Sequence, residues 1–161
     1  MIKELNITWE QYCSLCQSLA NYINKYKSEH PDIDVMIYGI PRGGVIVSHI
    51  LSYLTNSRVI NRTKFESYYD IVPFHKKHIF VVDDIIDSGN TLVDEFDEYF
   101  KYNSQQEKED DSIEVLALVQ NKDSKIKADF CAFPNDNGYW TVFPYDAEKD
   151  TISKVQKRDS K

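Results

Sequence analysis

The stretch Phe80-Val-Val-Asp-Asp-Ile-Ile-Asp-Ser-Gly-Asn-Thr-Leu92 decides the fold. The apolar run over residues 78–82 predicts a buried β-strand. We expect a loop over residues 83–89, followed by a helix that begins at Asn90 or the next residue and runs to about residue 102. A strand, a turn and a helix in direct succession are typical of an α/β protein.

The same stretch places carboxylates beside donors for an anion. Three aspartates follow the strand: Asp83, Asp84 and Asp87. A buried strand that ends in like charges needs compensation, which a magnesium ion or sugar hydroxyls can supply. Small residues then stand at the predicted helix N-terminus: Ser88, Gly89 and Thr91. Unpaired N–H groups and the helix dipole attract a phosphate there. A ribose 5-phosphate offers both features, whereas a plain helix cap needs only one such residue.

The rest of the chain alternates strands and helices around this stretch. We expect helices over 9–28 and 45–54, strands over 35–38, 58–61 and 113–119, and short β-like pieces near 130 and over 140–143. This order predicts a mainly parallel twisted sheet flanked by helices. In such sheets ligands bind beyond the carboxyl ends of the strands.

A second glycine-rich turn, Ile37-Tyr-Gly-Ile-Pro-Arg-Gly-Gly44, stands between a predicted strand and a predicted helix. Gly43 and Gly44 precede the helix, so backbone N–H groups point outward, and Arg42 adds a cation. Taken alone, the segment also fits a plain tight turn. Two anion-type sites at neighbouring strand ends suit a substrate with phosphate at one end and diphosphate at the other.

Composition limits the classes of function. The chain has 161 residues, 28% of them charged, and a net charge of -7. An acidic chain lacks the basic clusters that bind nucleic acid, and no apolar stretch reaches the length of a membrane span. We therefore expect a cytoplasmic protein with one domain over residues 1–148 and a charged tail over 149–161.

The stretch Phe80–Leu92 resembles the phosphoribosyl pyrophosphate (PRPP) motif of type I phosphoribosyltransferases: an apolar strand, two acids, two apolar residues, then Asp-Ser/Thr-Gly-x-Thr. The resemblance implies that Asp83 and Asp84 hold the ribose hydroxyls, partly through Mg²⁺. It also implies that one loop wraps the 5-phosphate: Asp87, Ser88, Gly89, Asn90 and Thr91. In the purine-salvage members, the acid that matches Asp87 lies near N7 of the base as a candidate general base.

Two further segments resemble the same family. The loop that matches Arg42, Gly43 and Gly44 binds pyrophosphate there, often after an unusual cis peptide, and Arg42 would stabilise the leaving group. Ser67 and Tyr68 match a mobile pair that closes over the substrate and excludes water. A surface aromatic is the alternative for Tyr68.

The base pocket rests on the resemblance to the 6-oxopurine enzymes, in which a small hood near the C-terminus binds the base. A lysine placed like Lys122 donates there to the purine O6, while an ordinary surface lysine is the alternative. In the segment 140–146, Trp140 would stack on the base, Thr141 or Val142 would offer backbone contacts, and Asp146 would accept from the 2-position. A core position is the alternative for Trp140.

The sequence thus predicts transfer of ribose 5-phosphate from PRPP to a nucleobase, with a 6-oxopurine as the expected acceptor and pyrophosphate and a nucleoside monophosphate as products. A non-catalytic PRPP or nucleotide sensor of the same fold and an enzyme with a different acceptor stay open. The Asp-Asp-x-x-Asp spacing also occurs in isoprenoid synthases, but there it lies on helices. A homo-oligomer, a dimer or tetramer, is expected because the resembling family forms them, and no nucleic-acid or membrane partner is expected.

Overall fold

The computed structural model describes residues 3–62, 77–94 and 111–146. Ser67, Tyr68 and the tail over 149–161 lie outside these ranges. The described strands form a five-stranded sheet in the order β3-β2-β4-β5-β6 and a separate two-stranded sheet of β1 and β7. Every described pair of neighbouring strands is parallel, which confirms the α/β class and the parallel sheet.

The five strands have these bounds: β2 Asp34–Gly39, β3 Arg58–Ile60, β4 Lys77–Ile86, β5 Asp111–Asn121 and β6 Phe130–Asn135. Successive residues of β2 and β4 enter opposite cores: Ile37 and Phe80 pack on one face of the sheet, Met36 and Val81 on the other. Both faces are therefore covered, and the strands read as continuous apolar runs instead of alternating ones.

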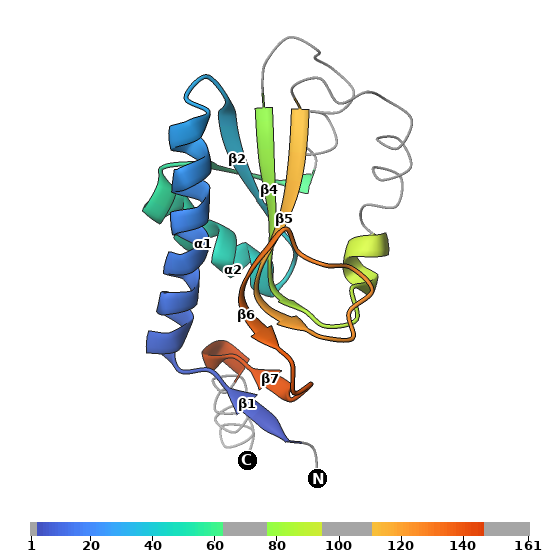
Figure 1. The fold of residues 1–161 in the computed structure, drawn as a ribbon. Helices are drawn as coiled ribbons and strands as arrows, with labels where there is room; N and C mark the ends of the chain where they lie inside the picture. The colour runs from blue at the N-terminus through green and yellow to red at the C-terminus, as the bar shows by residue number, and fades with distance from the viewer. Residues whose placement is uncertain (1–2, 63–76, 95–110, 147–161) are drawn as a thin grey trace, which may run out of the picture.

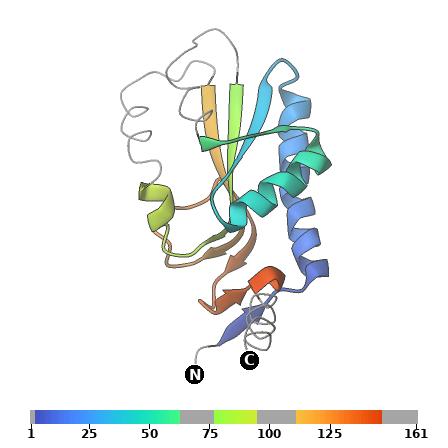
Figure 2. The same cartoon turned by 180° about the vertical axis from the view of Figure 1, so that it is seen from behind.

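Helices α1 (Trp9–Glu29) and α2 (Gly43–Thr55) cover the same face of the sheet (Figures 1 and 2). The helix α1 begins where Thr8 and Gln11 cap each other reciprocally through side chain and backbone. Its buried stripe, Tyr12, Cys16, Leu19, Ala20 and Ile23, packs against α2 and the sheet.

A small hood stands at the carboxyl end of the sheet. Its strands are β1 (Glu4–Asn6) and β7 (Trp140–Val142), and Leu5 pairs with Thr141. In Figure 1 the hood lies below the ends of β4, β5 and β6. The sequence predicted the β7 segment but not β1. Because β1 pairs with β7, the hood joins segments from both ends of the described chain.

The predicted loop over 83–89 is wrong in its first half, because β4 continues to Ile86. Its backbone pairs with β5 from Asp83 opposite Ala117 to Ile86 opposite Gln120. Backbone hydrogen bonding extends the strand past the point where its side chains become charged. The helix predicted from residue 90 does begin there, and residues 90–94 are helical.

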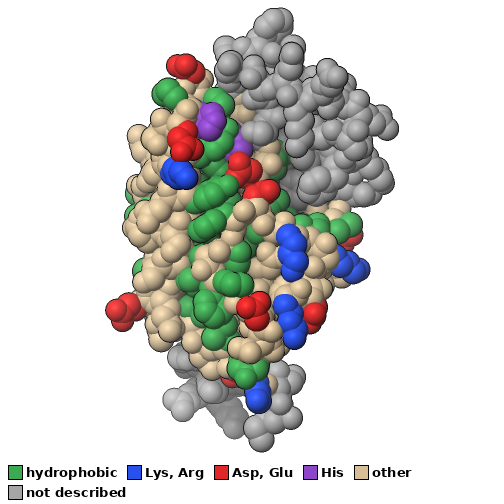
Figure 3. All heavy atoms as spheres, in the orientation of Figure 1, with side chains coloured by type: hydrophobic (Ala, Val, Ile, Leu, Met, Phe, Trp, Pro, Cys, Tyr) green, Lys and Arg blue, Asp and Glu red, His purple; other side chains and the backbone are tan. Residues whose placement is uncertain are grey.

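Figure 3 shows hydrophobic side chains running down the face seen in Figure 1, bordered by charged side chains of both signs. The described residues on this face thus form no continuous basic surface of the kind that binds nucleic acid. Among the described residues, no helix combines the length and apolar character required to span a bilayer.

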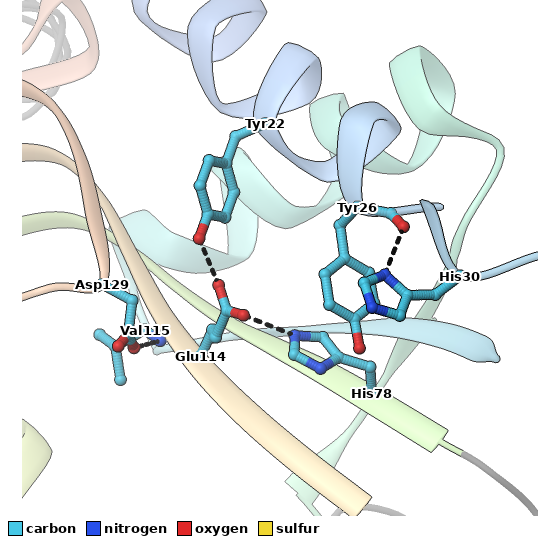
Figure 4. Close-up of polar contacts among 7 residues, drawn as sticks. All are labelled: Tyr22, Tyr26, His30, His78, Glu114, Val115 and Asp129. Carbon is cyan, nitrogen blue, oxygen red and sulfur yellow. Dashed lines mark hydrogen bonds and ion pairs between the residues drawn. The ribbon is translucent and has the colours of Figure 1, made fainter. Parts of the chain in front are cut away.

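A polar cluster lies near the amino ends of β4 and β5, and Figure 4 shows its side chains. The Tyr22 hydroxyl donates to Glu114 at 2.6 Å, and Glu114 lies 3.7 Å from Nε2 of His78. The His78 ring is buried against Tyr26, which also stacks on His30. Burial and the nearby His30 lower the pKa of His78 to about 4, so this imidazole is neutral at pH 7.

Candidate active site

A cavity of about 610 Å³ opens at the carboxyl ends of the strands, between the sheet and the hood. Four segments far apart in the sequence line it: the turn after β2 with the start of α2, the end of β4 with the loop after it, Asn121 at the end of β5, and the hood from Trp140 to Asp146. Parallel strands place their carboxyl ends at one edge of the sheet, which is why these segments meet.

Asp83 and Asp84 lie side by side at the end of β4. Asp83 is buried and Asp84 half-buried. Oδ1 of Asp83 accepts from the Asp84 amide at 2.9 Å, and Oδ1 of Asp84 accepts from the Ile85 amide at 2.8 Å. These bonds hold both carboxylates in fixed orientations at the cavity wall.

The turn after β2 packs directly on Asp84. A Cβ atom on Gly43 would lie 1.8 Å from Oδ2 of Asp84, so only glycine fits this approach. The peptide bond between Pro41 and Arg42 is cis, as the resemblance implied for this loop. The N-terminus of α2 has no side-chain cap and no acidic residue in its first turn, in contrast to α1. Gly43, its first residue, lines the cavity, and uncapped N–H groups at a helix start are suited to bind an anion.

The loop after β4 is the second glycine-containing turn at the cavity. Its Gly89 adopts a φ of +81°, which favours glycine, and a Cβ there would lie 3.0 Å from Oγ of Ser124. Oγ of Ser88 accepts at 3.3 Å from the amide of Asn90, the first residue of the helix that follows. Exposed hydroxyls of Ser88 and Thr91 border the cavity here.

The hood closes the cavity with aromatic rings. Trp140 lines it and is 61% exposed, which excludes a core position for this ring. Tyr145 stacks on Phe143, and its hydroxyl donates to Oδ2 of Asp84. Burial, and then the bond to Asp84, raise the pKa of the Tyr145 hydroxyl, so it stays protonated and a donor. Asp146 accepts from the Phe143 amide at 3.3 Å.

The cavity brings together most of the residues predicted from the sequence: Arg42, Gly43, Asp83, Asp84, Asp87, Ser88, Gly89, Thr91, Trp140, Thr141 and Asp146. Three others do not line it: Gly44, Asn90 and Lys122. Gly44 lies behind the turn, where a Cβ would meet the Val82 carbonyl at 2.4 Å. Lys122 is exposed, and the residue before it, Asn121, lines the cavity in its place.

Sequence reasoning missed Asn121 and Tyr145. The Asn121 amide donates to Oδ1 of Asp87 at 2.5 Å, and Tyr145 donates to Asp84. Each contact joins two segments that lie far apart in the sequence: the end of β5 and the loop after β4, or the hood and the end of β4. The only sequence signal was their position, since Asn121 directly precedes Lys122 and Tyr145 directly precedes Asp146.

The donor set at Asp83 and Asp84 fits Mg²⁺. The ion prefers oxygen ligands, keeps several waters and is commonly held by one or two carboxylates together with substrate phosphates. Within the described ranges, no group of three or more His, Cys, Asp or Glu side chains forms a closed metal site. Two carboxylates at an open cavity are what an ion shared with a phosphorylated ligand requires.

The fold and its cavity define the class: the chain has the type I phosphoribosyltransferase fold. A purine phosphoribosyltransferase from Pyrococcus horikoshii is 25% identical, with a TM-score of 0.63, over 89% of this chain and 94% of that one. A xanthine-guanine-hypoxanthine phosphoribosyltransferase from Helicobacter pylori is 20% identical, with a TM-score of 0.65, over 94% and 99%. No family model matches the sequence, and no curated protein does.

A third similar structure belongs to a hypothetical protein from Neisseria gonorrhoeae with bound ppGpp. It is 20% identical, has a TM-score of 0.62, and the match covers 97% of this chain and 98% of that one. The same fold thus occurs in a protein with a guanine nucleotide bound.

Proposed function

We propose that this protein transfers ribose 5-phosphate from PRPP to a nucleobase, with a 6-oxopurine as the acceptor and pyrophosphate as the leaving group. The observation that carries the proposal is the single cavity lined by both anion-type turns, the paired aspartates and the aromatic hood. Each part matches one part of the two substrates.

The two turns bind opposite ends of PRPP in this proposal. The N–H groups at the start of α2, with Arg42, take the pyrophosphate, because that helix end is uncapped. The loop over 87–91 takes the 5-phosphate through backbone N–H groups and the hydroxyls of Ser88 and Thr91. Asp83 and Asp84 then face the ribose hydroxyls between them, where their fixed orientations favour one sugar pose.

Charge in the cavity supports a role for Mg²⁺. The described lining residues include one cation, Arg42, and four carboxylates: Asp83, Asp84, Asp87 and Asp146. An anion as highly charged as PRPP needs more positive charge than one guanidinium supplies. Mg²⁺ held at Asp83 and Asp84 would neutralise the diphosphate and assist its departure.

The residues around the base have separate tasks. Trp140 offers its exposed ring face for stacking. Asp87 accepts the proton from the attacking nitrogen while positive charge develops on the ribose. The amide of Asn121, and not the exposed Lys122, is the polar donor beside Asp87 in the cavity.

The test is pyrophosphate release from PRPP with Mg²⁺, run separately with hypoxanthine, guanine, xanthine, adenine, uracil and orotate. Release with a 6-oxopurine is expected. Release only with adenine or a pyrimidine would keep the reaction and refute the proposed acceptor. No release with any base would refute the proposed enzyme.

A second candidate is a nucleotide-binding regulator of the same fold. The observation that favours it is the similar structure with bound ppGpp, a ligand that also carries diphosphates on a ribose. Calorimetric binding of ppGpp or PRPP without turnover would support this candidate. The closing role of Ser67 and Tyr68, the homo-oligomer, the single domain over 1–148 and the cytoplasmic location stay predictions.

A further inference from the structure

Three polar side chains stand in a row across the carboxyl edge of the sheet. Asp87 directly follows β4, Asn121 ends β5 and Asn135 ends β6, and Asn121 pairs with Asn135 in the strand register. Burial increases along the row, because Asp87 is exposed, Asn121 half-buried and Asn135 only 2% exposed. The row thus links the buried side chain of Asn135, its anchor, to the cavity.

The hydrogen bonds along this row have one direction. Nδ2 of Asn135 donates to the Tyr139 carbonyl at 2.7 Å and to Oδ1 of Asn121 at 2.6 Å. A carbonyl only accepts, so the amide nitrogen of Asn135 must face Tyr139. Asn121 therefore turns its oxygen toward Asn135 and its nitrogen toward Asp87. A tight turn ends this anchor, where the Gly138 amide donates to the Asn135 carbonyl at 3.2 Å.

We infer that Asn121 is a positioning residue, which Asn135 orients so that its amide holds the Asp87 carboxylate at the cavity. This inference rests on the proposed function, in which Asp87 receives the proton from the base. An exposed carboxylate samples several rotamers, whereas one bonded to an oriented amide is held in a single arrangement. The amide is neutral, so it holds Asp87 through a hydrogen bond and not through an ion pair.

The direction of the row predicts the effect of two isosteric variants. Asn121→Asp places a second carboxylate against Asp87 and removes the donor. Asn135→Asp cannot donate to Tyr139 or Asn121, so Asn121 turns its nitrogen toward residue 135 and its oxygen toward Asp87. Both variants should lower kcat about 10- to 100-fold, the effect of losing one hydrogen bond to a charged group. KM for PRPP should change less than about threefold, since backbone groups bind the phosphates.

The decisive experiment is a double-mutant cycle of Asn121→Ala and Asp87→Ala, assayed with the base that supports release. If Asn121 acts through Asp87, the double variant will be no slower than Asp87→Ala alone, within about twofold. If the loss of kcat in the double variant equals the product of the two single losses, the residues act independently, and the inference is overturned. Asn21→Ala is the matched control, because Asn21 also accepts from a side-chain amide, that of Gln17 at 3.0 Å, but on the exposed surface of α1.

A second measurement separates this inference from the proposed function. In ¹H–¹⁵N spectra, the side-chain amide resonances of Asn121 and Asn135 should move in Asp87→Ala and stay in place in Asn21→Ala. If the native protein releases no pyrophosphate with any base, the proposed function fails, and the spectra still decide whether the row holds Asp87. Unmoved Asn121 resonances in Asp87→Ala would overturn the inference, whatever the activity.

Discussion

Replacing Gly43 with alanine tests how the turn after β2 and the end of β4 are built together. The added Cβ would lie 1.8 Å from Oδ2 and 2.2 Å from Cγ of Asp84, far inside van der Waals contact. Gly43 is the first residue of α2 and does not have a positive φ, so alanine suits its backbone. The clash therefore falls on the Asp84 carboxylate, which must turn away.

The cost follows from the two hydrogen bonds that Asp84 would lose, one from the Ile85 amide at 2.8 Å and one from the Tyr145 hydroxyl. Hydrogen bonds to a charged group contribute about 1.5–3 kcal/mol each. Water regained by the half-buried carboxylate and the better helix propensity of alanine offset about a third to a half of this sum. We expect Gly43→Ala to lower the free energy of unfolding by about 2–4 kcal/mol and to weaken PRPP binding at least about tenfold.

Urea unfolding and calorimetry with Mg²⁺ and PRPP measure the two effects. The control is the same substitution in an Asp84→Ala background, where the space that the Cβ needs is empty. There, Gly43→Ala should be neutral or slightly stabilising, because only the better helix propensity of alanine is left. An equal loss in both backgrounds would refute the reasoning, because the clash would then not lie with Asp84.

Three further predictions concern single side chains. Asp87→Asn should leave the unfolding midpoint in urea nearly unchanged and lower kcat about 10²- to 10⁴-fold, the usual contribution of a general base; an unchanged kcat would remove Asp87 from the mechanism. Tyr145→Phe should lower the free energy of unfolding by about 1–2 kcal/mol in urea titrations, because Asp84 loses a donor while the ring stack is kept; no change would show that this bond adds nothing. The pKa of His78, about 4 when folded, lies below its unfolded value, so its contribution to stability is full above pH 6.5 and lost as the pH falls to 4. Over that window the free energy of unfolding should fall by about 2–3 kcal/mol, and that of the His78→Leu variant should fall by less in the same urea titrations.

The parallel sheet could be predicted because its strands are buried on both faces and read as apolar runs between glycine-rich turns. The end of β4 could not, because Asp83 and Asp84 look like loop residues. Their backbone pairing depends on the length of β5, which lies 25 or more residues further along the chain. The strand β1 has only three residues and pairs with β7, at the far end of the described chain, so no local signal marks it.

The lining residues could be predicted where a motif carries them, as over Asp87 to Thr91, because the turn, the glycine and the helix start set the local geometry together. The residues on the base-binding side of the cavity were harder to predict, because successive side chains at a strand end point to opposite faces of the sheet. A difference of one or two residues in where β5 ends decides whether Asn121 or Lys122 enters the cavity. The expected strand ended at Val119, whereas β5 continues to Asn121.

Product formation from PRPP and a 6-oxopurine in the presence of Mg²⁺ tests the central claim most directly. With guanine, hypoxanthine or xanthine, mass spectrometry should find the nucleoside 5′-monophosphate and pyrophosphate in equal amounts, and a chelator should abolish both. PRPP that binds in the calorimeter but stays unconverted with every base tested would contradict the account and assign the cavity to nucleotide sensing.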